Sequence, residues 1–208
     1  MAVKQAKRRA KESPGAQELL VLELQEIFSA ESQLARALPR LNKAVGSEQL
    51  RQMLEQRLSE GEQVLAEVES ALEELDESPG RKRNVAAEGL INDAREHSQE
   101  IEAGPALDAV LIAAIQKTEH YCIAAWGTVR SLAEATGQKT AARAMERALK
   151  EGKKYDEQLT KLAEEEITPA LLEADSGEED DSEESQEPGA GRGRSGSGRG
   201  GRERRPSA

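Results

Sequence analysis

The sequence predicts an all-α protein, a four-helix bundle with a long helical crossover and disordered charged tails. The chain of 208 residues is rich in Ala, Glu, Leu, Lys and Arg, a composition typical of long helices. It holds one Trp, two Tyr and one Phe, too few aromatic residues for a β-sandwich or barrel. Four long segments carry apolar residues at alternating spacings of three and four, which is the pattern of bundle helices.

The first of these segments begins at Ser13 and Pro14, a good N-cap followed by the residue favoured at the first helical position. We expect Pro39 to kink this helix or end it early, and Gly46 to close it. Glu31 is the only charged residue on its apolar face, which otherwise holds Leu20, Leu24, Ile27, Leu34, Leu38, Leu41 and Val45.

The second helix follows Ser47, its expected N-cap, and ends at Ser78, Pro79 and Gly80. Glu62 lies one helical turn from apolar residues on both sides and is therefore expected on or beside the buried face. Gly61 would allow another helix to approach closely. The buried face is predicted to hold Leu54, Leu58, Leu65, Val68, Leu72 and Leu75.

A weaker amphipathic pattern covers residues 85–102, and Gly104-Pro105 separates it from the third long helix. A crossover of this length is what a bundle with parallel second and third helices requires.

The third and fourth long helices each carry one acid on the apolar face. The third ends at Gly137, its expected C-cap, and the fold is expected to end at Pro169. The acid of the third helix is Glu119, among Ile112, Ile115, Cys122, Trp126, Val129 and Ala133. The acid of the fourth helix is Asp156, among Ala142, Met145, Leu149, Gly152, Leu159 and Ala163.

Charge is strongly segmented along the chain, whose formal net charge is −11. Residues 1–12 form a basic arm of net charge +4, and the bundle of residues 13–172 carries −11. An acidic linker at 173–187 carries −9, and a Gly/Arg-rich tail at 188–208 carries +5. We expect the arm and both tail segments to be disordered, because they bury too little apolar area to offset the entropy of ordering. The tail is interpreted as a solubilising extension or as a weak nucleic-acid contact through its Arg and Gly residues.

Several classes of protein are not indicated by the sequence. No apolar run is long enough to span a membrane, and the basic start lacks the apolar stretch of a secretory signal. The single cysteine, Cys122, favours a reducing cytoplasm over a disulfide-stabilised protein. We find no Gly-rich phosphate loop, no Ser-His-Asp set and no CxxC motif.

Each long helix thus places a carboxylate near its middle, on or beside the face it should bury. Mid-helix positions of an antiparallel bundle come level with one another, so these groups would meet. Their repulsion can be relieved by protons, by Lys or Arg partners, or by metal cations. In a chain this highly charged, each acid can also lie on its track by chance. Carboxylates with imidazole suit iron or manganese.

Several strings of the sequence resemble one known family. LLVLELQEIFSAESQLARALPRL, AAEGLI, LIAAIQKTEHYCIAAWGT and KKYDEQLTKLAEE look like the YciE/YciF family of bacterial ferritin-like proteins. The resemblance covers roughly 17–166. It implies a ferritin-like four-helix bundle that is commonly dimeric, occurs in stress-linked bacterial proteins and is suspected of holding a two-metal carboxylate site.

The resemblance also indicates which ligands such a site would keep. Glu31 and Glu119 match family acids. Ser59, Gly152 and Cys122 stand where the family usually has carboxylates, and the first two fall at positions expected for bridging ligands. We therefore expect a partly degenerate site that binds one ion, or two weakly.

Two functions remain open from the sequence. The first is a stress-associated ferritin-like protein with an iron or manganese site and ferroxidase-type activity. The second is a non-catalytic bundle that acts in protein assembly or stress protection through dimerisation and its charged tails. We expect a cytoplasmic homodimer in either case. The candidate metal ligands are Glu31, Glu62, Glu119 and Asp156, with His120 and Cys122 as additional candidates.

Overall fold

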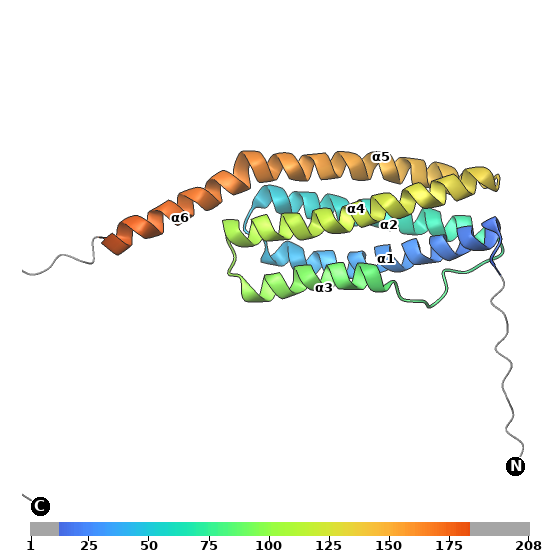
Figure 1. Ribbon diagram of the computed structural model, residues 1–208, viewed down its shortest axis with the longest axis horizontal. Coiled ribbons are helices and arrows are strands. Elements are labelled where there is room, and N and C mark those ends of the chain that lie inside the picture. Colours follow the sequence, from blue (N-terminus) through green and yellow to red (C-terminus); the bar gives the residue numbers. More distant parts are fainter. Residues whose placement is uncertain (1–12, 184–208) are drawn as a thin grey trace, which may run out of the picture.

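The computed structural model describes residues 13–183, with side chains up to residue 176, and this part of the chain is built from helices (Figure 1). The predicted arm at 1–12 and the tail from 184 onward lie outside the described residues. The helices are α1 (Ala16–Ala44), α2 (Glu48–Glu73), α3 (Val85–Glu100), α4 (Pro105–Ala135), α5 (Lys139–Leu162), the π-helical turn η1 (Ala163–Ile167) and α6 (Thr168–Glu183).

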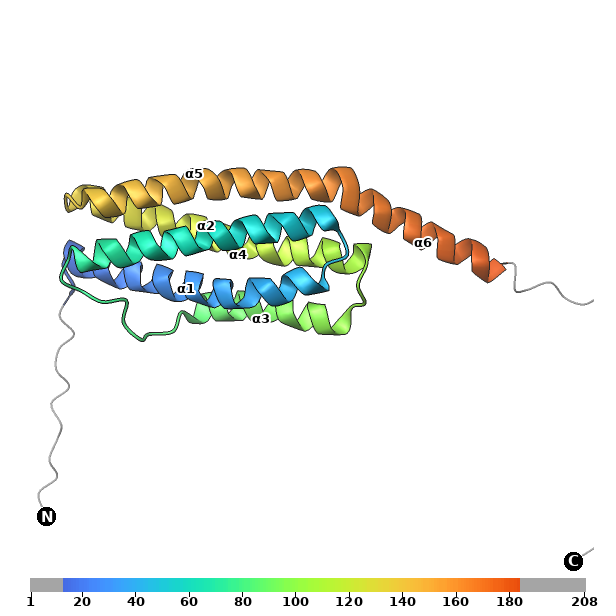
Figure 2. The ribbon, with the colours of Figure 1, turned by 180° about the vertical axis from the view of Figure 1, so that it is seen from behind.

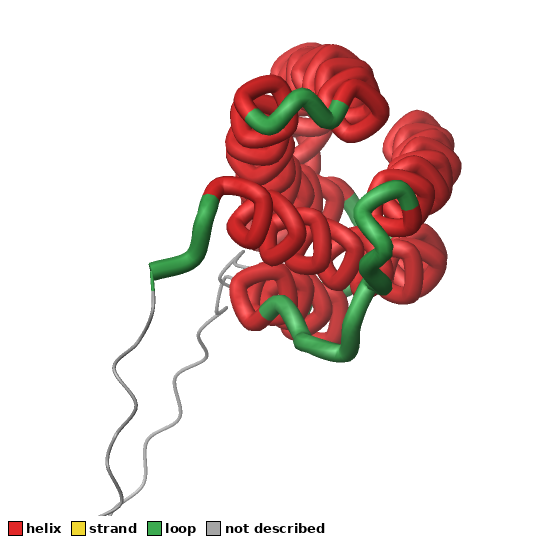
Figure 3. The backbone as a smooth tube through the Cα atoms, turned by 90° about the vertical axis from the view of Figure 1, so that its right-hand side faces the viewer, coloured by secondary structure: helices red, strands yellow, loops and turns green. Residues whose placement is uncertain are grey.

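Four of these helices form a ferritin-like bundle. α1 packs against α2 and α4, and α5 packs against the same two helices from the other side. Each of these neighbours runs antiparallel to the next, so that α2 and α4 are parallel across the bundle (Figures 1 and 2). The crossover helix α3 lies against α1 and α4 on the outside (Figure 3). The predicted all-α bundle with a long helical crossover is confirmed.

The helix ends follow ordinary capping chemistry, with one exception to the prediction. The Ser47 hydroxyl accepts from the Leu50 amide at 3.2 Å, as expected of an N-cap. The predicted Ser13 cap is wrong, because α1 begins at Ala16 after the N-cap Gly15. The Glu18 carboxylate accepts from the Gly15 amide at 2.8 Å and so satisfies this end of the helix.

Helix α1 continues through Pro39 to Ala44, so the expected early end is wrong. Proline removes one hydrogen bond, the one to the carbonyl of Ala35. Pro39 is exposed and Ala35 is only half-buried, so water can reach that carbonyl. The neighbouring Leu38 and Leu41 are buried, and their packing outweighs the local loss.

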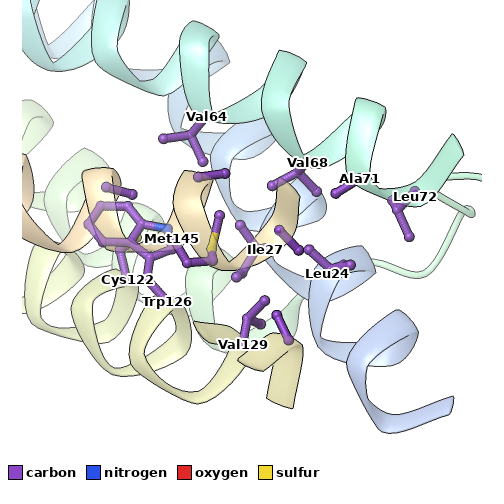
Figure 4. Close-up of a cluster of buried hydrophobic side chains, with 14 of the residues drawn as sticks. Leu24, Ile27, Val64, Val68, Ala71, Leu72, Cys122, Trp126, Val129 and Met145 are labelled. Carbon is purple, nitrogen blue, oxygen red and sulfur yellow. The ribbon is translucent and has the colours of Figure 1, made fainter. Parts of the chain in front are cut away.

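The core consists of two apolar clusters that follow one another along the bundle. The first cluster includes Leu24, Ile27, Val64, Val68, Trp126, Val129 and Met145 (Figure 4). The second includes Leu41, Leu50, Leu54, Leu111, Ile112, Tyr155 and Leu159. Three buried charged side chains lie at the join between the clusters: Glu31, Arg57 and Glu119. The polar centre is therefore in the middle of the bundle.

The chain does not leave its helical path at Pro169, where the fold was expected to end. It passes through η1 into α6, which reaches Glu183 and extends beyond the end of the bundle (Figure 1). Pro169 directly follows Thr168, whose amide donates to the Ala163 carbonyl in the π-helical turn. Its missing amide removes one hydrogen bond of this continuous helix, but Pro169 and the preceding Glu164 and Glu165 are exposed, so water can reach the freed carbonyl. Residues 173–183 of the predicted acidic linker are thus helical.

Helices that are long and apolar enough to cross a membrane do not occur in the described part of the chain.

Candidate functional site

An arginine holds two glutamates together at the middle of the bundle. The guanidinium of Arg57, on α2, donates from Nη1 and Nη2 to the two carboxylate oxygens of Glu31, each at 3.1 Å. Its Nε donates to Oε2 of Glu119 at 2.7 Å. The three side chains are 1–3% exposed, so water does not screen these charges. We call Glu31, Arg57 and Glu119 the ion-paired centre.

Arg57 was missed in the sequence, although a signal for it exists. The buried stripe of α2 is Leu50, Leu54, Arg57, Gly61, Val64, Val68 and Leu72. The predicted stripe followed Leu58 and Leu65, which are half-buried neighbours on the edge of that face. Since leucines occupy both tracks, periodicity alone did not fix the phase in the middle of the helix.

Two glycines leave room for the ion-paired centre. A Cβ on Gly61 would lie 2.9 Å from Nη1 of Arg57 and 3.0 Å from Oε2 of Glu31. A Cβ on Gly152, on α5, would lie 2.6 Å from Oε1 of Glu119. All three distances are at or below the limit that real Cβ contacts show, so a larger residue at either position would push against the centre. The interpretation of Gly61 as a close-approach residue is consistent with this geometry.

The groups of the ion-paired centre change one another's pKa values. Burial by itself lowers the pKa of Arg57, but Glu31 and Glu119 outweigh it, and the pKa of Arg57 lies well above its usual value. The guanidinium also lies over the ring of Trp126, 5.7 Å from the centroid. Burial raises the pKa of Glu119, and Arg57 counters only part of that increase. The guanidinium of Arg57 therefore stays positively charged, and the two glutamates beside it contribute at most two negative charges.

Cys122 is a buried neutral thiol next to the ion-paired centre. It is 2% exposed, and its Sγ lies 3.8 Å from Nη2 of Arg57. Burial, followed by the charge of Glu31, raises the pKa of the thiol well above its usual range. A thiol in that state is a poor metal ligand, because the thiolate is the coordinating form.

Two predictions about α2 are wrong. Glu62 is exposed and does not lie on the buried face. Ser59 is also exposed, so it is not at a bridging position in the bundle interior. Both errors follow from the phase of the helix, because Arg57 and Gly61 point inward and residues 59 and 62 consequently point outward.

Asp156 lies apart from the ion-paired centre. It is half-buried on α5, and its carboxylate is 3.1 Å from Nε2 of His120, whose side chain is 67% exposed. Gln116 donates to the same carboxylate at 3.2 Å. Asp156 and His120 thus form a surface pair between α4 and α5. His120, an additional candidate ligand in the sequence, therefore pairs with Asp156 at the surface and does not reach the ion-paired centre.

The interior beside the ion-paired centre has little free space. A cavity of about 20 Å³ lies next to Arg57 and Glu119, enough for about one water molecule. Among the described residues, Oε1 of Glu119, Nε1 of Trp126 and the Tyr155 hydroxyl are buried without a protein hydrogen-bond partner. A buried water is the ordinary partner for such atoms. The cavity has no room for an organic substrate.

These residues do not fit the two-metal site that the fold suggests. Of the four predicted carboxylates, Glu31 and Glu119 come together, while Glu62 and Asp156 do not. Arg57 takes up both oxygens of Glu31 and one of Glu119, the atoms that a metal ion would require. Within residues 13–176, no three His, Cys, Asp or Glu side chains gather as metal ligands would.

The fold and this centre define a ferritin-like helical bundle in which an arginine paired with two glutamates fills the middle. The model of a family described as a domain of unknown function, DUF892, matches residues 15–172. The chain therefore belongs to that family, and the resemblance to the YciE/YciF proteins is confirmed.

Individual relatives agree with this assignment. Protein YciF of Escherichia coli is 40% identical over 141 residues, which are 67% of this chain and 85% of YciF. The crystal structure of that stress protein matches with a TM-score of 0.69 over 73% of this chain and 96% of YciF, at 38% identity. YcfI of Rhodopseudomonas palustris matches with a TM-score of 0.68 at 30% identity, over 73% of this chain and 96% of YcfI.

A more distant structure shows the fold alone. It is a two-domain protein of Anabaena variabilis that contains a DJ-1/ThiJ/PfpI-like and a ferritin-like domain. It is 11% identical, with a TM-score of 0.51 over 95% of this chain and 49% of that protein.

Proposed function

We propose that this protein is a non-enzymatic, stress-associated member of its family, in which the ion-paired centre takes the place of a metal centre. The observation that carries the proposal is the position of Arg57 between Glu31 and Glu119. A buried guanidinium with both carboxylates already bonded supplies the positive charge that a cation would otherwise supply. It leaves no open coordination position for oxygen or peroxide.

The association with stress comes from relatives. The E. coli relative is described as a stress protein, and the R. palustris relative as a candidate structural protein. Both descriptions are compatible with a bundle that acts through its surface. On this proposal the protein works as a cytoplasmic homodimer, and its charged ends provide further contacts, including weak contact with nucleic acid through residues 188–208. Sedimentation analysis of the full chain tests the dimer.

Iron or manganese binding is the alternative, and a metal titration separates it from the proposal. The purified chain is analysed for metal by mass spectrometry, and its thermal unfolding is measured with a chelator, with ferrous iron and with manganese. We expect no bound metal in stoichiometric amount and the same melting temperature in all three conditions. A site filled by metal at one hundred times its Kd would add about 2.7 kcal/mol.

Two matched variants show where any metal effect originates. Glu31→Gln changes a carboxylate of the ion-paired centre, whereas Glu62→Gln changes an exposed carboxylate outside it. Retained iron with a raised melting temperature, lost in Glu31→Gln but kept in Glu62→Gln, would overturn the proposal and restore the metal centre.

A further inference from the structure

A basic groove lies on the outside of the bundle, on the surface of α1 and α3, and contains none of the residues of the ion-paired centre. Its cavity has a volume of about 670 Å³, within the range of small-molecule sites. Its lining residues come from α1, from the loop before α3 and from α3 itself, which are neighbouring segments in Figure 2. Six cationic side chains line it against one carboxylate, Glu88: Arg36, Arg40, Arg81, Lys82, Arg83 and Arg95. We call this surface the basic groove.

The concentration of positive charge is unusual for this chain. The bundle of residues 13–172 carries a net charge of −11, so an even distribution would leave few cations unpaired. Lys82 pairs with Glu26 at 2.6 Å, and Arg83 pairs with Glu88 at 2.9 Å. The other four arginines of the basic groove have no carboxylate within 4.0 Å in the described part of the chain. Their mutual repulsion would be relieved by an anion between them.

The loop that carries three of these cations is held in place. The Ser78 carbonyl accepts from the Gln25 side chain at 2.8 Å, which attaches the start of the loop to α1. At its end, the Asn84 amide donates to the Ser29 hydroxyl at 2.9 Å. The Asn84 carbonyl accepts from Gln33 at 3.0 Å, in a buried contact. The groove is therefore largely formed before any ligand arrives, which lowers the entropy cost of binding.

The floor of the basic groove is partly apolar. Phe28 is half-buried and Ile91 is 8% exposed, and both belong to or pack against the first core cluster. Ser32 and Asn92 add polar groups to the lining. Guanidinium groups form bidentate hydrogen bonds with phosphate oxygens, and a nucleobase can stack on an aromatic side chain.

We propose that the basic groove binds a small molecule with several phosphate groups, such as a nucleotide or an oligophosphate. The proposal does not depend on the proposed function, because the groove and the ion-paired centre share no residue. A nucleic acid is the less favoured ligand. An extended strand would have to leave the groove across the acidic surface of the bundle, where its phosphates are repelled.

The test measures binding by titration calorimetry on the full chain, at about 50 mM salt, where phosphate contacts are strong. The probes are inorganic tripolyphosphate, ATP without metal, and single-stranded oligothymidine. The groove variant combines Arg36→Gln with Arg95→Gln. The matched control combines Arg143→Gln with Lys150→Gln, two exposed cations on α5 whose loss changes the net charge equally. A third variant replaces the six arginines of residues 188–208 by serine.

We expect the groove variant to bind tripolyphosphate and ATP at least about tenfold more weakly, since it loses two guanidinium groups that hydrogen-bond phosphate oxygens. The matched control and the tail variant should change the affinity by less than about twofold. Tighter binding of ATP than of tripolyphosphate, lost in Phe28→Ala, would identify a nucleotide. Equal binding of the two probes would identify the phosphates as the recognised group.

Four results would overturn the proposal. The parent chain binds neither small probe at millimolar concentration, or the groove variant and its control lose affinity equally, or binding depends on the tail arginines alone. Groove-dependent binding of oligothymidine without binding of the small probes would also overturn it, in favour of a nucleic-acid surface. Since the substituted cations of α1, α3 and α5 are exposed, circular dichroism should show the same helix content in the groove variant, its control and the parent.

Discussion

Removal of Arg57 should destabilise the bundle far more than removal of a comparable arginine at its surface. Arg57→Met deletes three charge-assisted hydrogen bonds of 2.7–3.1 Å and leaves two carboxylates buried together. Breaking a buried ion pair by removing one partner costs about 3–5 kcal/mol. A domain of this kind has a total stability of about 5–15 kcal/mol, so the variant should fold but with a small margin.

Arg147 provides the matched control. It also binds a glutamate with two nitrogens, Glu67, at 3.0 and 2.8 Å. Its side chain and that of Glu67 are 28% and 29% exposed, so Arg147→Met should cost less than about 1 kcal/mol. Urea unfolding followed by circular dichroism at pH 7 gives both values. Equal costs for the two variants would refute the assignment of Arg57 as the group that neutralises the centre.

The pH dependence of Arg57→Met is a second signature. Burial already raises the pKa of Glu119, and loss of the guanidinium that counters this increase raises that pKa further above its value in the unfolded chain. A carboxyl with a raised pKa contributes stability at low pH that is lost as the pH rises. The difference in free energy of unfolding between the parent and Arg57→Met should therefore become smaller as the pH falls from 7 toward about 4.5, the ordinary pKa of a glutamate. A difference that is independent of pH would contradict this.

Replacing the whole centre by apolar residues should be harmless to stability. The triple change Glu31→Leu, Arg57→Met and Glu119→Leu is expected to be neutral or to stabilise the bundle by about 1–4 kcal/mol. The double change Glu31→Leu with Glu119→Leu should instead be destabilising, because it leaves Arg57 as an unpaired buried cation. The same urea titration compares the two, and a double variant more stable than the triple would contradict the argument.

Three further predictions concern Gly152, Cys122 and the C-terminal segment. Gly152→Ala should lower the free energy of unfolding by about 1–3 kcal/mol in urea titrations, although Ala favours the helix. The reason is that the added Cβ would lie 2.5 Å from Trp126 and 2.6 Å from Glu119. An unchanged free energy of unfolding would show that these side chains move aside without cost. Cys122 should resist thiol reagents until the chain unfolds. Relative to Cys122→Ala, the free energy of unfolding of the parent should fall by about 1.4 kcal/mol per pH unit above 9. The raised pKa of the buried thiol keeps it protonated, while the thiol of the unfolded chain ionises. Parallel profiles of unfolding free energy against pH for the two proteins would contradict this. Deletion of residues 173–208 should lower the thermal midpoint by no more than a few degrees, since the described side chains of α6 beyond residue 172 are exposed; a larger fall would show that this segment packs on the bundle.

The origin of the remaining errors in the site is local. Glu31 and Glu119 were found in the sequence because each is the only acid on a clean apolar track. Glu62 was misplaced by a rotation of α2 that the sequence leaves undecided, since leucines occupy neighbouring tracks. Asp156 follows the buried Tyr155, and a shift of one residue on a helix turns a side chain by about 100° away from the centre.

The sequence alone determined the class of fold, because the spacing of Leu, Ile and Val residues decides which face of each helix leaves water, and this depends on local order only. It also placed Glu31 and Glu119 on buried faces, together with Glu62 and Asp156, which the structure does not bury. Only the tertiary structure decided what neutralises Glu31 and Glu119. Arg57 comes from a different helix than either glutamate, and the spaces at Gly61 and Gly152 exist only once α2 and α5 are packed. The partner of a buried charge depends on contacts between residues that are distant in the sequence. The apolar periodicity of a single helix does not specify these contacts or their energy.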